Sequence, residues 1–115
     1  MQKIPLDSSN LSVHTAASTG DLEALIKIEE SNPEAIHEVD ANGWTALHEA
    51  VRSEHIEVIK YLLSKGSDIN QRTHHGEGGS PLWWAKYYHG KDSKVVKYLE
   101  SKGAKDLAPK KDMIV

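Results

Sequence analysis

One tract of this chain is repeated almost unchanged. Residues 58–66 read VIKYLLSKG and residues 95–103 read VVKYLESKG. A weaker correspondence lies nearer the N-terminus, where His14 and His48 are each followed two residues later by an alanine. The copies lie about 34 to 37 residues apart, a period typical of chains built from stacked supersecondary units. This repetition constrains the fold to a series of similar layers instead of one irregular core.

The spacing of apolar residues predicts that each layer is a pair of helices. The expected pairs cover residues 12–19 and 21–31, 46–53 and 56–64, and 81–89 and 93–101. Thr45 and Ser80 can cap helix starts through their hydroxyl groups. Gly66 and Gly103 can take the left-handed conformation just past a helix end. Because each helix has one apolar stripe, a neighbouring layer is needed to bury it.

The middle copy resembles an ankyrin repeat. Residues 40–50 read DANGWTALHEA, which contains the T-x-L-H-x-A core, and residues 66–70 read GSDIN. The resemblance implies an all-α ankyrin-repeat solenoid of three stacked helix-turn-helix units with short finger loops. Expected boundaries are an N-terminal extension at 1–10, a repeat domain at 11–105 and a polar C-terminal tail at 106–115. The repeats are placed at about 11–39, 40–73 and 74–105, and the tail is expected to fray.

Composition excludes several classes of function. The 14 basic and 17 acidic side chains give a formal net charge of −3, without the basic stripe of a nucleic-acid-binding protein. The chain has no cysteine, so disulfides and thiol chemistry are absent. No apolar run suits a membrane span, and residues 1–10 lack the apolar core of a signal peptide. We expect a cytoplasmic protein, although the nucleus is compatible with the same features.

Neither catalysis nor metal binding is predicted. The seven histidines include no H-E-x-x-H pattern, and the glycines at 76–79 do not form a phosphate-binding loop. His48 is expected to bond the Thr45 hydroxyl and a neighbouring backbone carbonyl, and His14 to occupy the equivalent structural site. His74 and His75 are interpreted as a solvated loop tip. No cofactor, metal or catalytic residue is assigned.

Partner-binding residues follow from the resemblance. Ankyrin-like domains bind partners on a concave face made of finger tips and outward positions of each first helix. The matching positions in the second and third repeats are Asn42, Trp44, Arg52, Ser53, Glu77, Tyr87 and Tyr88. Large amphipathic side chains of these types are enriched in binding hot spots. The alternative is that Trp44 and Tyr88 only cover neighbouring loops.

Two further assignments concern Trp83, Trp84 and Asn70. Trp83 stands where the repeat normally has histidine, and the tryptophan pair is expected to cover the open end of the stack. The alternative is that the two tryptophans form an exposed apolar patch, which usually marks an interaction site. Leu62 followed by the DIN of residues 68–70 looks like the ankyrin pattern hydroxylated by 2-oxoglutarate-dependent oxygenases, with Asn70 as the acceptor. The alternative role for Asn70 is structural, through hydrogen bonds that hold the loop.

The resulting function is a protein-protein interaction module that binds a partner of unknown identity on its concave face. A regulatory or targeting domain associated with a catalytic chain is the first alternative. The second is a scaffold that self-associates through the tryptophan-bearing end, although a monomer is expected.

Overall fold

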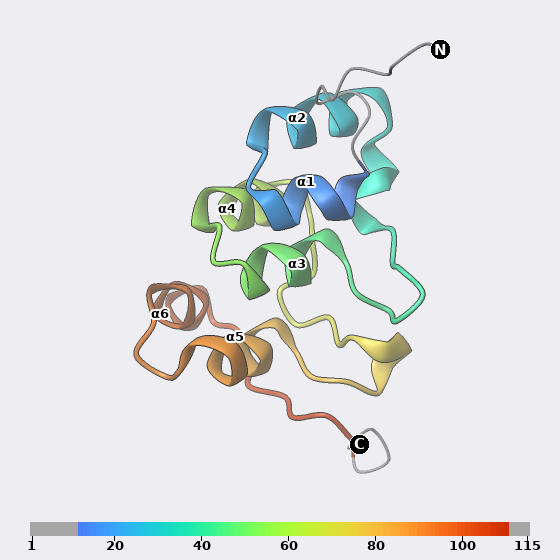
Figure 1. The fold of residues 1–115 in the computed structure, drawn as a ribbon. Coiled ribbons are helices and arrows are strands. Elements are labelled where there is room, and N and C mark those ends of the chain that lie inside the picture. The colour runs from blue at the N-terminus through green and yellow to red at the C-terminus, as the bar shows by residue number, and fades with distance from the viewer. Residues whose placement is uncertain (1–11, 111–115) are drawn as a thin grey trace, which may run out of the picture.

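The computed structural model describes residues 12–110, which form six α-helices and two short 3-10 helices and contain no strand. The α-helices are α1 (Val13–Thr19), α2 (Leu22–Ser31), α3 (Ala46–Arg52), α4 (Ile56–Ser64), α5 (Pro81–His89) and α6 (Lys94–Ser101). They follow one another as three pairs, and each pair is one layer of a stack (Figure 1). The predicted all-α class is therefore confirmed.

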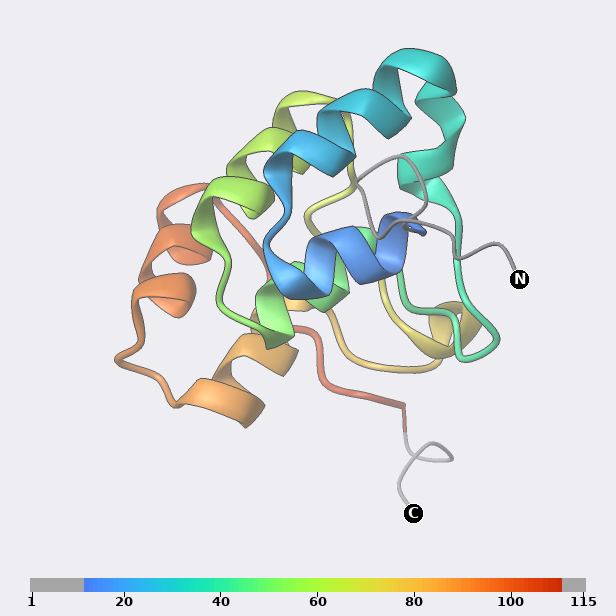
Figure 2. The same ribbon diagram turned by 45° about the horizontal axis from the view of Figure 1, so that its top comes forward.

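The helices form two rows. The first helices, α1, α3 and α5, lie one beneath another, and the second helices, α2, α4 and α6, lie in a row beside them (Figures 1 and 2). Helix α3 contacts α1 on one side and α5 on the other. The largest fully buried aliphatic side chains lie in the core that the rows enclose, and they include Leu25, Ile36, Leu47, Val51, Ile59, Leu62, Val95 and Leu99. The apolar stripes are thus buried against neighbouring layers.

Local signals in the sequence place the helix ends. The Thr45 hydroxyl accepts from the backbone N–H of the third helical residue of α3, and Ser80 does the same for α5. Pro81 is the first residue of α5, where its missing N–H costs no hydrogen bond. Gly66 and Gly103 lie just past α4 and α6 with φ of 98° and 80°. Left-handed glycines at these positions end the two helices.

Two 3-10 helices lie in the connections between layers. Helix η2 (Pro33–His37) leaves the first layer and buries Ala35 and Ile36. Helix η3 (His74–Gly76) lies in the finger loop of the third layer, beside the finger loop of the second, where His74 N donates to Asn42 O at 2.9 Å. The fingers therefore hold each other in place on one side of the stack (Figure 1).

The segment 106–110, which was expected to fray, is bonded to the third layer. Ser80 N donates to Leu107 O at 2.9 Å, and Lys110 N donates to Glu77 O at 2.8 Å. These pairs run antiparallel, and the Ser80 hydroxyl accepts from Leu107 N at 3.0 Å. The polar composition of the tail obscured this pairing, because backbone groups make most of its hydrogen bonds.

Glu54 adopts a conformation that costs stability. Its φ is 61°, and the matching residue of the first layer is Gly20, with φ of 76°. A left-handed conformation costs a non-glycine residue roughly 1–2 kcal/mol, and the greater freedom of glycine in the unfolded chain offsets about half of that gain. We expect Glu54→Gly to raise the free energy of unfolding by about 0.5–1 kcal/mol in urea titrations. Glu57→Gly, inside α4, should lower it by a similar amount.

The predicted gain in stability of Glu54→Gly assumes that the glutamate side chain makes only a weak contact. Its Oε1 lies 3.7 Å from His89 Nδ1. A Glu54→Gly variant that is less stable than the original chain would show that this contact outweighs the backbone strain.

Candidate partner-binding face

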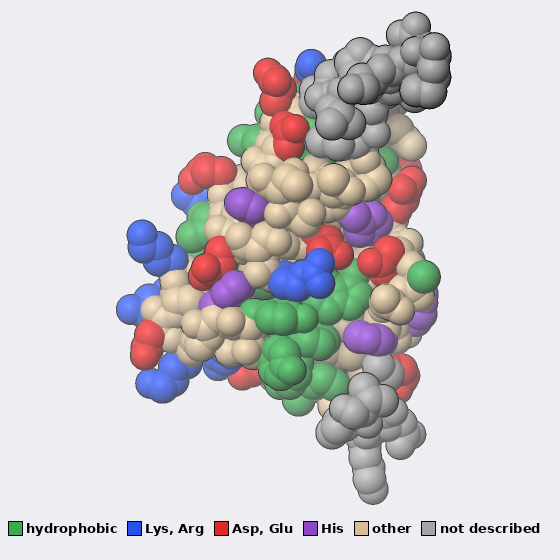
Figure 3. Space-filling view, in the orientation of Figure 1, with side chains coloured by type: hydrophobic (Ala, Val, Ile, Leu, Met, Phe, Trp, Pro, Cys, Tyr) green, Lys and Arg blue, Asp and Glu red, His purple; other side chains and the backbone are tan. Residues whose placement is uncertain are grey.

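Helix α5 carries four aromatic side chains that lie together at the surface, and we call them the aromatic face: Trp83, Trp84, Tyr87 and Tyr88. Trp83 stacks on Tyr87 with ring centroids 5.3 Å apart, and Trp84 stacks on Tyr88 at 5.7 Å. The spacing of four residues makes these stacks, because such side chains lie on the same side of a helix. Tyr87 is 66% exposed and Tyr88 43%. Figure 3 shows hydrophobic side chains gathered over this part of the molecule.

Trp44 supports the aromatic face and has little surface of its own. Its ring lies 4.9 Å from the ring of Trp84, and the guanidinium carbon of Arg52 lies 5.2 Å from its centroid. Only 8% of Trp44 is exposed. The prediction that Trp44 contacts a partner directly does not fit this burial, because its neighbours already cover the indole. The alternative reading, in which Trp44 covers neighbouring groups, describes its place better.

Trp84 also lies differently from the expectation. Its indole N–H donates to the Thr73 hydroxyl at 3.0 Å, and its ring faces Trp44 of the second layer. The prediction that Trp84 covers the open end of the stack is therefore wrong, because Trp84 packs towards the second layer. Trp83 packs on the Gly79 backbone, where an added Cβ would lie 2.7 Å from the indole.

The other predicted contact residues lie on α3 and on the two finger loops. Arg52 is exposed and forms an ion pair with Glu49. Ser53 is half-buried at the end of α3, and Asn42 is exposed at the tip of the second finger. Glu77 lies in the third finger, and its carboxylate is 3.6 Å from Lys110 Nζ. The structure places Arg52 against the ring of Trp44, which itself contacts Trp84.

His48 and Thr45 form a buried network. His48 Nδ1 lies 2.8 Å from the Thr45 hydroxyl and 3.0 Å from Thr45 N, and Nε2 lies 2.7 Å from Gln71 O. A carbonyl can only accept, so Nε2 carries the proton and Nδ1 accepts from Thr45 N–H. Burial lowers the pKa of His48 to about 4, although the bond to Gln71 and the charges of Asp40 and Asp68 act in the other direction. The imidazole is therefore neutral, and its role is structural.

Three other histidines tie neighbouring layers together. His14 Nε2 donates to Trp44 O at 2.8 Å. His55 Nε2 donates to Ser18 O at 3.0 Å, and His89 Nε2 donates to Val51 O at 3.0 Å. The sequence predicts a structural role for His14, but we did not predict the bonds of His55 and His89 to the neighbouring layers. The sequence signal is their spacing. His55, three residues after α3, and His89, the last residue of α5, lie 34 residues apart, which is the period of the repeat.

Asp40 and Thr73 shape the fingers and were also missed. The Asp40 carboxylate accepts from Asn42 N at 2.8 Å and from Trp44 N at 3.0 Å. Burial raises the pKa of Asp40, but these two hydrogen bonds and the electrostatic effect of His14 and Arg52 together outweigh it, so the pKa lies below its usual value. Thr73 is fully buried and accepts the indole N–H of Trp84. Asp40, four residues before Trp44, is the sequence signal for the turn in the second finger.

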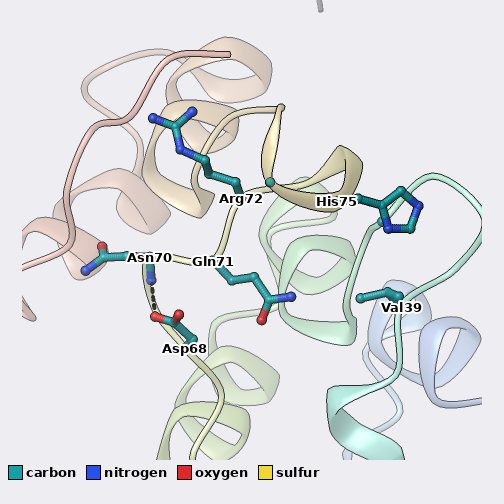
Figure 4. Close-up of a pocket in the computed structure, with 8 residues that line it drawn as sticks. Val39, Asp68, Asn70, Gln71, Arg72 and His75 are labelled. Atoms are coloured by element: carbon teal, nitrogen blue, oxygen red, sulfur yellow. Dashed lines mark hydrogen bonds between the residues drawn. The ribbon is translucent and has the colours of Figure 1, made fainter. Parts of the chain in front are cut away.

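Asn70 lines a pocket of about 420 Å³ between the segment 39–43, which leads into the second layer, and the segment 68–76, which leaves it. Figure 4 shows it beside Asp68, Gln71 and Arg72. Its backbone N–H donates to Asp68 Oδ1 at 2.9 Å, and its own Oδ1 accepts from Lys105 N at 2.8 Å. The side chain holds the loop in the way the structural alternative requires. Hydroxylation of Asn70 stays a prediction.

Within residues 12–110 no three histidine, aspartate or glutamate side chains gather as a metal site. No helix in the same range has the length and apolar character needed to cross a bilayer.

Stacked helix pairs joined by paired fingers define the class of helical repeat solenoids. Residues 13–110 match the family described as "Ankyrin repeats (3 copies)", and the chain belongs to that family. Ankyrin repeats are generally protein-protein interaction modules. The crystal structure of the human ASB11 ankyrin repeat domain superposes with a TM-score of 0.68 at 30% identity, covering 84% of this chain and 41% of that one.

Curated relatives match over the repeats alone. Human NAD-capped RNA hydrolase NUDT12 is 42% identical over 55 residues, which are 48% of this chain and 12% of the hydrolase. Human transient receptor potential cation channel subfamily A member 1 is 42% identical over 67 residues, 57% of this chain and 6% of the channel. The chain thus spans a small part of the length of these relatives.

Proposed function

We propose that this protein binds a partner protein on its concave face, with the aromatic face at the centre of the contact. The observation that carries the proposal is the exposure of Tyr87 and Tyr88 on a first helix. Together with Val39 they are the exposed large hydrophobic side chains among residues 12–110. Exposed aromatic clusters of this kind mark interaction sites.

The aromatic face is also rigid before binding. Trp84 is held by the Thr73 hydroxyl at 3.0 Å and by the ring of Trp44, and the two tyrosines lie 5.2 Å apart against it. Rings fixed in this way lose little conformational entropy when a partner covers them. Pre-organisation therefore favours α5 as the place where binding energy concentrates.

Removing both tyrosine rings should abolish most partner binding. For Tyr87→Ala/Tyr88→Ala we expect affinity for a captured partner to fall by at least about 30-fold, the effect of losing about 2 kcal/mol at a hot spot. The measurement is recovery from lysate followed by calorimetric titration of the recovered protein. Lys94→Ala/Lys97→Ala on α6 is the matched control and should bind normally. Equal recovery by both variants would remove the aromatic face from the proposal.

A second candidate is a regulatory or targeting domain that serves a catalytic chain. The observation in its favour is that the stretch matched in the human hydrolase is 12% of that enzyme. A catalytic reading frame adjoining this one would support the candidate, and a stop codon at Val115 would weigh against it. Self-association is a third arrangement, and a sedimentation mass that stays constant with concentration would remove it. Cytoplasmic placement also stays a prediction.

A further inference from the structure

Several polar groups of the proposed concave face are already bonded within the chain. The Ser18 hydroxyl donates to Thr15 O at 3.1 Å. His55 and His89 each use Nε2 to donate to backbone carbonyls at 3.0 Å, those of Ser18 and Val51. A partner gains no hydrogen bond from groups that are satisfied before it arrives.

The charges beside the aromatic face are engaged as well. Arg52 pairs with Glu49 and lies over the Trp44 ring. Glu54 contacts His89 at 3.7 Å. An acidic partner would have to compete with Glu49 for the one guanidinium at the face. The surface therefore favours a segment without charge.

Three polar groups of the aromatic face remain open. The hydroxyls of Tyr87 and Tyr88 and the indole N–H of Trp83 form no hydrogen bond with any described residue. Among residues 12–110, the one buried side-chain polar atom that lacks a hydrogen-bond partner is Ser67 Oγ. The indole nitrogen of Trp83 also lacks a partner there but is not buried, so it reaches the surface. All three groups can donate, so the face matches a ligand that presents acceptors.

From this inventory we propose that the partner presents an extended, uncharged, proline-rich segment to the aromatic face. This inference rests on the proposed function. A polyproline II segment has no internal hydrogen bonds, so its carbonyls are free to accept, and proline has no N–H to satisfy. Its rings pack on aromatic side chains, and its stiffness limits the entropy lost on binding. A helical segment would offer fewer backbone acceptors, because all but its last four carbonyls are bonded to its own backbone.

Two capped peptides of equal length and zero charge test the inference. One repeats proline and leucine, and the other repeats alanine and leucine in a helical pattern. Each is titrated into the full chain and followed by tryptophan fluorescence. The proline peptide should bind more tightly than the helical one. Its dissociation constant should change less than about two-fold between low and high salt, because no ion pair forms.

Removing the two tyrosine hydroxyls distinguishes the contribution of the hydrogen-bond donors to binding from that of the aromatic rings. Tyr87→Phe/Tyr88→Phe should weaken the proline peptide by about 5- to 30-fold, the loss of two ordinary hydrogen bonds. Tyr98→Phe on α6 is the matched control, since Tyr98 lies outside the aromatic face, between Lys60 and Lys102. It should leave the affinity unchanged.

The outcomes distinguish the two proposals. If a captured partner needs Tyr87 and Tyr88 but the proline peptide does not bind, or binds no better than the helical one, the inference is overturned and the proposed function stands. Binding that weakens steeply with salt, or that survives Tyr87→Ala/Tyr88→Ala, also overturns it. If captured partners bind Tyr87→Ala/Tyr88→Ala as tightly as the original chain, the proposed function fails as well.

Discussion

Gly43→Ala should lower the free energy of unfolding by about 3 kcal/mol, the largest effect we expect from one added methyl group. Gly43 has φ of 75°, a conformation that costs alanine roughly 1–2 kcal/mol. An added Cβ would also lie 2.4 Å from His75 N and 2.6 Å from His74 N. These are backbone atoms of the neighbouring finger, so the clash cannot be relieved by rotating a side chain. Urea unfolding followed by tryptophan fluorescence measures the effect.

Gly76→Ala is the matched control for this prediction. Gly76 has φ of 101°, but nothing lies within 4 Å of the Cβ that would be added. Its cost should be roughly 1–2 kcal/mol, the backbone strain alone. Equal losses at the two sites would show that the fingers can move apart, and that their contact is not fixed.

Acidification from pH 7 to pH 5 should remove about 2 kcal/mol of stability through His48 alone. Its pKa is about 4 in the folded protein and 6.5 without the fold. Below 6.5 the unfolded chain binds a proton that the folded protein does not, so the contribution of His48 is complete above pH 6.5. It falls with pH until the folded protein is protonated as well, near pH 4. Urea titrations at several pH values follow this loss.

The His48→Gln variant isolates this contribution. It should be less stable at pH 7, and its stability should fall less between pH 7 and pH 5. Asp40 does not interfere, because the pKa of its carboxyl lies below 3.8 and acts only in stronger acid. An unchanged slope in the variant would assign the pH dependence to other groups.

Much of the fold could be predicted because its signals are local. The repeated tract, the caps at Thr45 and Ser80 and the glycines after α4 and α6 each depend on a few neighbouring residues. Helix starts and ends were placed within one residue of those in the structure. The pairing of residues 106–110 was missed because it is formed by backbone groups, which any sequence supplies.

The candidate site was predicted less completely. The exposed positions of Tyr87 and Tyr88 follow from aligning the repeats. The burial of Trp44 depends on Arg52 and Trp84, which approach it from two different helices. Such an arrangement is set by tertiary packing, and the spacing of residues along the chain does not reveal it.

The histidine bonds between layers have a thermodynamic consequence. His14, His55 and His89 each bond a backbone carbonyl of a neighbouring layer, so no layer can separate from its neighbour without breaking such a link. With only three layers and strong coupling between nearest neighbours, we expect melting to be all-or-none. A destabilising change in the first layer then lowers the fraction of folded molecules. It does not alter the geometry of the aromatic face in those molecules that remain folded.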